Sequence, residues 1–417
     1  MDEVQLEADQ IYKSHFGKMV SSLLRFSDAI DLNAAEDLVQ DSFSTALISW
    51  RKDGLPGNPT AWLFRVCKNK ALNKIKESKR FSNLFIEEAI HPTDVALSKF
   101  PLDDQQLILL FACAHPDLSP KVQVVITLKY VVNLKVEAIA KILGMTVDGI
   151  DKLLVRVRQK IKDENILFFE PVVEELKSRI HIVHKILYLI FNEGYKSSWG
   201  KELIREELCE EGLMMTRALL NSSVGNKATS ALYALMLFNA ARFKARFGTH
   251  GELMDLEEQD RTLWNRELIQ LAFFHLERSR GDTISEYHYE ASIAGMHCSA
   301  ENFAATDWKT ITILYNCLLK INPNPFVELN YAIALYYAGQ KNEALLILHK
   351  LESEPFFNQY YLLHASLGRI YFAEDNHVLA NKYFMETLKL TGSPAEKCFI
   401  QRILEKMASP QSIRINQ

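Results

Sequence analysis

Apolar residues recur along most of the chain with the spacing of an amphipathic helix, and the alternation typical of a β-strand is nearly absent. In residues 34–50, Val39, Phe43, Ala46 and Trp50 are separated by four, three and four positions, which predicts one buried stripe. Only 16 Gly and 12 Pro interrupt the 417 residues. The pattern therefore predicts an all-α protein, and a chain of this length predicts several domains.

Helix-breaking residues divide the chain into predicted domains. Residues 51–59 separate the helix at 34–50 from a second helix expected at 61–78, and together these helices define a first domain over 1–80. Residues 81–104 have weak periodicity and two prolines, which predicts a linker. A second compact helical domain is expected over 105–165, followed by a long helical extension over 166–417.

The extension contains a repeat that resembles the tetratricopeptide pattern, a pair of antiparallel helices. Its matching positions are Leu367, Gly368, Tyr371, Ala380 and Phe384. Residues 332–351 form a weaker copy. We therefore expect tetratricopeptide-like helical hairpins around residues 326–392.

Charge is distributed unevenly. The formal net charge of −4 argues against a protein that binds DNA by itself, because such proteins carry a basic surface that neutralises phosphates. Residues 26–50 nevertheless contain five acids and no base, residues 61–80 contain seven bases and one acid, and residues 152–162 contain five bases and no acid. This pattern predicts a protein that docks on a basic partner through one segment and contacts DNA through two others.

Three helical faces are the candidate binding surfaces. In the helix at 34–50, Asp37, Gln40, Asp41 and Ser44 lie opposite the apolar stripe. The helix at 61–78 has a basic face next to Trp62 and Phe64, a combination in which cations hold phosphates and aromatic rings stack on unpaired bases. Taken alone, either face is also typical of a solvated helix surface. Residues 136–162 supply the third element.

Residues 136–162 have the pattern of a helix-turn-helix. A helix over 136–143 ends at Gly144, and Thr146 is expected to cap the next helix. Ile150, Leu154, Val157 and Ile161 should face inward, which leaves the basic side chains outward. The second helix of such a motif enters the major groove of DNA.

No pattern predicts an enzyme, a metal site, a cofactor site or a membrane segment. The six cysteines include no C-x-x-C pair, and His181 and His184 have no third metal ligand at a sensible spacing. Phosphate-loop, nucleophile-elbow and zinc motifs are absent. The longest apolar run, residues 107–114, is far shorter than the roughly 18 residues that span a bilayer. We therefore expect a cytoplasmic protein without cofactor or metal.

Several strings in order resemble extracytoplasmic-function (ECF) sigma factors of bacterial RNA polymerase. AEDLVQDSF at 35–43 resembles that family's polymerase-binding helix, PTAWLFRV at 59–66 resembles its −10 promoter element, and residues 134–162 resemble its −35 reader. The strings FACAHP at 111–116, LIFNEGY at 189–195, EQDRTLW at 258–264 and TDW at 306–308 resemble the subgroup with a long C-terminal extension. The resemblance covers essentially the whole chain.

The resemblance implies an alternative sigma factor whose partners are core RNA polymerase and promoter DNA. It assigns polymerase binding to Asp37, Leu38, Gln40 and Asp41. It assigns −10 recognition to Asn58, Trp62, Arg65, Asn69, Asn73 and Lys76. It assigns −35 recognition to Lys152, Arg156, Arg158, Gln159 and Lys160. The chain departs from the family at Asn73, Leu153 and the single Cys113, and the first two affect the promoter sequence.

Two alternatives have less support. A helix-turn-helix activator with a tetratricopeptide sensor, binding operators, explains 134–162 but leaves the first two helices unassigned. An enzyme in the extension lacks any catalytic motif. Within the extension, Glu193, Asp260, Arg261 and Asp307 are expected to form polar pairs between helices rather than a ligand site. The short apolar junction at 163–171 predicts that the extension packs against the sigma domains and regulates them, with the resemblance favouring an extension needed for activity.

Overall fold

A computed structural model describes residues 3–26, 30–81, 105–143, 145–164, 166, 173–195, 206–246, 248, 254–392 and 394–408. Every regular element in these ranges is helical, which confirms the predicted all-α class. The chain divides into two compact units, residues 1–225 and 226–417. The predicted boundary near residue 165 therefore falls inside the first unit. Residues 82–104 of the predicted linker lie outside the described ranges.

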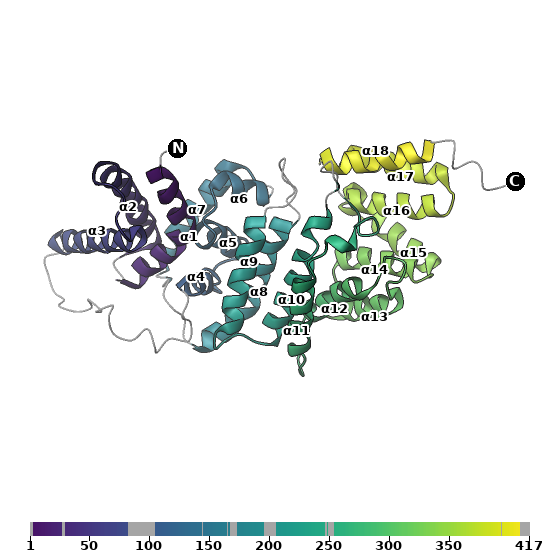
Figure 1. Cartoon of the computed structure of the whole chain (residues 1–417), viewed down its shortest axis with the longest axis horizontal. Helices are drawn as coiled ribbons and strands as arrows, with labels where there is room; N and C mark the ends of the chain where they lie inside the picture. Colours follow the sequence, from purple (N-terminus) through teal and green to yellow (C-terminus); the bar gives the residue numbers. More distant parts are fainter. Residues whose placement is uncertain are drawn as a thin grey trace. The chain divides into compact units, whose positions relative to one another are not determined.

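The first unit begins with three helices that pack on one another (Figure 1). They are α1 (Glu3–Phe26), α2 (Leu32–Asp53) and α3 (Pro59–Phe81). Asp31 caps α2 by accepting a hydrogen bond from the Ala34 amide at 2.8 Å, and Gly54, with φ of 85°, ends the helix. The predicted stripe Val39, Phe43, Ala46 and Trp50 is buried, as expected.

The next five elements contain the helix-turn-helix. They are α4 (Gln105–Cys113), α5 (Pro120–Ile126), the π-helix η2 (Thr127–Val131), α6 (Val136–Ile142) and α7 (Val147–Asp163). Thr146 accepts a hydrogen bond from the Gly149 amide at 3.1 Å, which confirms the predicted N-cap of α7. The predicted inward face, Ile150, Leu154, Val157 and Ile161, is buried. Gly144, the predicted turn residue, lies outside the described ranges.

Helix α4 is apolar around its whole circumference, and every residue from Leu107 to Ala114 is buried. On one side it packs on α1 and η2, and on the other on α8 (Val173–Tyr195) and α9 (Glu206–Asn221). Arg179 of α8 donates a hydrogen bond to the Phe111 carbonyl at 3.3 Å, and Gln106 donates to Glu211 of α9. A helix that is hydrophobic all round is stable only when covered on every side.

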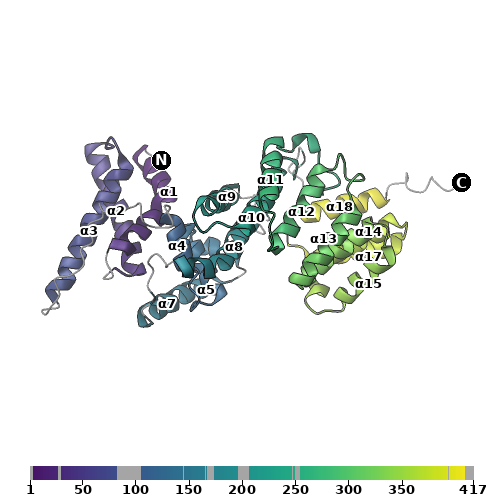
Figure 2. The same ribbon diagram turned by 90° about the horizontal axis from the view of Figure 1, so that it is seen from below.

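In the described part of the second unit, too, every regular element is helical. They are α10 (Lys227–Ala240), η3 (Phe243–Arg246), η4 (Arg261–Leu263), α11 (Arg266–Arg278), α12 (Glu286–Ser299), α13 (Trp308–Ile321), α14 (Pro325–Tyr337), α15 (Lys341–Glu352), η5 (Phe357–Gln359), α16 (Tyr361–Ala373), α17 (His377–Leu390) and α18 (Pro394–Ala408). Helix α10 packs on both α11 and α12, and α13 packs on α14 (Figure 2). No helix in the described ranges is long and apolar enough to cross a bilayer.

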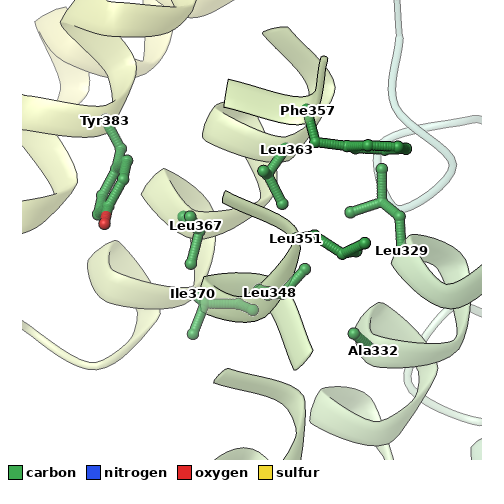
Figure 3. Close-up of a cluster of buried hydrophobic side chains, with 9 residues drawn as sticks. All are labelled: Leu329, Ala332, Leu348, Leu351, Phe357, Leu363, Leu367, Ile370 and Tyr383. Carbon is green, nitrogen blue, oxygen red and sulfur yellow. The ribbon is translucent and has the colours of Figure 1, made fainter. Parts of the chain in front are cut away.

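Two helical hairpins, α14–α15 and α16–α17, occupy the region in which repeats are expected. Their shared core joins Leu329 and Ala332 of α14 to Leu348 and Leu351 of α15 and to residues of η5, α16 and α17 (Figure 3). Gly368 of α16 lies against Phe384 of α17, where an added Cβ would come within 2.8 Å of the ring. This close approach explains why the pattern has a glycine there.

Candidate nucleic-acid interface

The polar face of α2 is exposed as predicted at Asp37, Gln40 and Asp41. Asp41 forms an ion pair with Lys70 of α3, so this carboxylate links the acidic helix to the basic one. Leu38 differs from its predicted neighbours because it is buried, with 8% of its surface exposed. In this arrangement Leu38 belongs to the core, and a docking partner would contact the acids around it.

The predicted −10 face lies along α3. Arg65, Asn69, Asn73 and Lys76 are all exposed, and their spacing of four, four and three places them on one side of the helix. A nucleic-acid strand following this side would meet two cations and two amides. The face is therefore suited to phosphate and base contacts together.

Two residues at the start of α3 have structural partners. The Asn58 side chain accepts a hydrogen bond from the Ala61 amide at 2.9 Å and so caps α3. Trp62 is partly buried, with its ring centroid 5.5 Å from that of the buried Trp50. Trp62 is therefore partly packed on the core and keeps part of its surface exposed.

Of the predicted −35 residues on α7, Arg158 differs from the others in its contacts. Lys152, Arg156, Gln159 and Lys160 are exposed, and Lys160 donates to the Asp117 carbonyl at 2.7 Å. Arg158 is instead directed at α2, where its guanidinium lies 2.8 Å from the Glu36 carboxylate. It also donates to the Tyr130 hydroxyl at 3.0 Å. In this arrangement Arg158 is not available to DNA.

Glu36 is a functional candidate that the sequence analysis missed. Its side chain is only 7% exposed, and it pairs with Arg158 of α7 and with Lys129 of η2, the latter at 3.0 Å. One sequence feature could have identified Glu36: it lies three residues before Val39 and seven before Phe43. This spacing places an acidic side chain on the apolar stripe of the helix. A carboxylate on that stripe requires a buried partner. Glu36 thereby joins the acidic helix to the helix-turn-helix.

Burial and the Glu36 charge together raise the pKa of the Tyr130 hydroxyl. Tyr130 is fully buried beside this ion-pair network. Desolvation also raises the pKa of the Cys113 thiol to about 12, so Cys113 is an inert core residue at neutral pH. No group of three or more metal-ligating side chains occurs in the described ranges.

The motif residues of the extension have structural partners. Asp260 caps η4 through the Thr262 amide at 2.9 Å, and Asp307 caps α13 through the Thr310 amide at 3.0 Å. Hydrogen bonds from the Thr262 hydroxyl and amide lower the pKa of Asp260, and those from the Thr310 amide and hydroxyl lower the pKa of Asp307. Arg261 makes a contact to another helix, by donating to backbone carbonyls at the end of α12. The expected polar pairing is thus replaced by local capping at the two acids.

Comparison with known proteins supports this geometry. Residues 11–81 match the family description "Sigma-70 region 2", residues 108–161 match "Sigma-70, region 4", and residues 179–280 match a family of unknown function, DUF6596. An uncharacterized protein of Rhizobium meliloti (strain 1021) is 30% identical over 398 residues, which cover 94% of this chain and 93% of the relative. No solved structure matches significantly.

The first match runs from within α1 to the end of α3 and includes the acidic and basic faces, and the second runs from within α4 into the last turn of α7 and includes the helix-turn-helix. The third begins within α8 and ends after α11. These matches imply interaction with core RNA polymerase and promoter DNA. The chain belongs to the sigma-70 family of transcription initiation factors, as a sigma factor with a C-terminal extension.

Proposed function

We propose that this protein is an ECF-type alternative sigma factor that binds core RNA polymerase through α2 and selects promoters through α3 and α7. The observation that carries the proposal is that one compact unit exposes three separate helix faces with the side chains that these contacts require. These are the acids on α2, the basic and amide side chains on α3, and the cations on α7. The proposal implies a cytoplasmic protein, because polymerase and promoter are there.

Docking on polymerase would use the exposed carboxylates Asp37 and Asp41. Charge complementarity of this kind sets orientation and association rate more than affinity. It also accounts for a net charge of −4 in a promoter-binding protein, since the polymerase supplies most phosphate contacts.

Recognition of the −10 element would use the accessible surface of Trp62 and the row from Arg65 to Lys76. Extruding a base costs a few kcal/mol. Stacking on an aromatic side chain recovers about 1–3 kcal/mol per base. The basic row would hold the backbone of the same strand. Together these contacts would favour the melted promoter over the duplex.

The extension would act by supporting the helix-turn-helix domain, in the sense of an extension needed for activity. The packing of α8 and α9 on α4 supports this role, because the extension then buries part of an apolar helix next to the helix-turn-helix. If Arg158 contacts the −35 box, as the family resemblance implies, its ion pair with Glu36 must first break.

Promoter-specific transcription with purified core polymerase tests the proposal. We expect the wild-type chain to direct initiation, and Asp37→Arg to reduce polymerase binding severalfold in a pull-down. Asp53→Arg is the matched control, because it makes the same charge reversal at an exposed position on the same helix. Equal polymerase binding by both variants and wild type would mean that the α2 face is only solvated. A specific gel shift without polymerase would instead favour an operator-binding activator.

A further inference from the structure

Trp264, at the end of the EQDRTLW segment, is surrounded by an arginine cluster that promoter recognition does not use. Trp264 is buried, with 2% of its surface exposed. The guanidinium carbons of Arg242 and Arg261 lie 5.4 and 4.6 Å from the centroid of its ring. Arg266, exposed at the start of α11, adds a third positive charge that lowers the pKa of Arg261, after the larger effects of burial and Arg242. Two guanidiniums therefore share one buried indole.

The four acids from Asp255 to Asp260 have other partners. Asp255 and Glu257 pair with Arg369 of α16, and Glu258 pairs with Arg402 of α18. Asp260 caps η4. Within the described ranges, no carboxylate forms a salt bridge with Arg242 or Arg261, although acids of the same loop pair with Arg369 of α16 and Arg402 of α18. Among the described residues, the two guanidiniums at Trp264 therefore have no carboxylate counter-ion, and the Arg242 Nε donates to the neutral Gln259 side chain at 3.3 Å.

The same cluster contains buried donors that have no acceptor. Arg261 uses Nη1 to donate to the carbonyls of His297 and Ala300, at 2.6 and 2.7 Å. Its Nη2, the Trp264 Nε1 and the His297 Nδ1 are buried and have no hydrogen-bond partner among the residues that the structure describes. Guanidinium and indole groups can only donate. Burial, and then the charges of Arg242 and Arg261, lower the pKa of His297 to about 3, so His297 adds no positive charge at neutral pH.

We propose that Arg242, Arg261 and Trp264 form a binding site for a small oxyanion, either a phosphate or a carboxylate group. An oxyanion supplies both missing elements, because its oxygens accept from Arg261 and Trp264 while its charge compensates the two guanidiniums. A water molecule would satisfy the donors but would leave the charge uncompensated. The site lies wholly within the second unit, and it is independent of polymerase binding and promoter selection.

The test is titration of the full chain with sodium phosphate and, separately, sodium acetate, each against sodium chloride at equal ionic strength. The chain is labelled with 5-fluorotryptophan, and the Trp264 resonance is assigned by its loss in Trp264→Phe. We expect this resonance to shift saturably with at least one oxyanion and not with chloride. The oxyanion that acts identifies the ligand as a phosphate or a carboxylate group.

Variants link the response to the cluster. Arg242→Gln removes one guanidinium and should weaken the binding at least tenfold. Arg278→Gln is the matched control, because Arg278 also lies over an aromatic ring, 5.4 Å from the centroid of Phe274, and the substitution removes the same charge. Arg278→Gln should bind like the wild type. A wild-type resonance that responds to neither oxyanion, or a response unchanged in Arg242→Gln, would overturn the proposal.

Discussion

Replacing Glu36 by Gln tests whether ion pairs hold the acidic helix α2 against η2 and α7. The substitution keeps the volume of the side chain and removes its negative charge. Lys129 and Arg158, now 3.0 and 2.8 Å from the carboxylate, would then face each other across a neutral amide. Because η2 and α7 each contribute one cation, both elements should loosen together.

The magnitude follows from burial. Removing one partner of a fully buried ion pair costs about 3–5 kcal/mol, and an exposed pair contributes about 0–1 kcal/mol. Glu36 is 7% exposed, whereas the side chains of Lys129 and Arg158 are 16% and 30% exposed and stay partly hydrated. We therefore expect a loss of about 2 kcal/mol, which corresponds to roughly a 30-fold change in a local opening equilibrium.

Amide hydrogen exchange measured by mass spectrometry is the suitable assay, because a chain of two units need not unfold in one transition. Exchange in α7 and η2 should accelerate roughly 30-fold in Glu36→Gln, by the estimate above. Glu137→Gln, at an exposed position on α6, makes the same chemical change and should leave exchange unaltered. In Glu36→Gln/Arg158→Gln the loss should be smaller than the sum of the single losses. Exchange in α7 at the wild-type rate would refute the ion-pair argument.

Three further perturbations address other parts of the chain. Burial lowers the pKa of His184 to about 4 in the folded protein. As the pH falls below 6.5, His184 is therefore protonated in the unfolded chain before it is protonated in the folded one. The free energy of unfolding should consequently be about 2 kcal/mol lower at pH 5 because of this group. Acid-denaturation curves should flatten in His184→Gln and not in the exposed control His181→Gln. Gly368→Ala forces a methyl group against Phe384 and should cost about 1–3 kcal/mol in thermal unfolding of the second unit, an expectation that an unchanged midpoint would contradict. Arg156→Ala should cost about 1–3 kcal/mol at one promoter position in transcription assays if this side chain reads a base, whereas uniform weakening would indicate a phosphate contact.

Local patterns predicted the helices and their caps because the determinants lie within a few residues of each other. The stripe from Val39 to Trp50 and the cap at Thr146 are examples, and both are observed. The Glu36 network was not predictable in the same way, since Arg158 lies 122 residues away along the chain. An acidic residue on an apolar stripe indicates that the carboxylate has a buried partner, but the local sequence does not identify that partner.

The extension shows the same limit in another form. Asp260 and Asp307 were expected to pair between helices, but each caps the element that follows it directly. Short-range capping competes with long-range pairing for the same carboxylate, and the backbone amides are always nearby. By contrast, Arg261 has a long side chain with several donors, which reaches the carbonyls of α12.

The covering of α4 by α8 and α9 has a consequence for synthesis of the protein. Helix α4 ends at Cys113 and α9 ends at Asn221, so the ribosome adds 221 − 113 = 108 further residues before the cover is complete. At about 5–20 residues per second this takes roughly 5–20 s. During that interval an apolar helix on the nascent chain has no partner on one side. Chaperone occupancy of ribosome-bound chains should therefore peak between the emergence of α4 and that of α9.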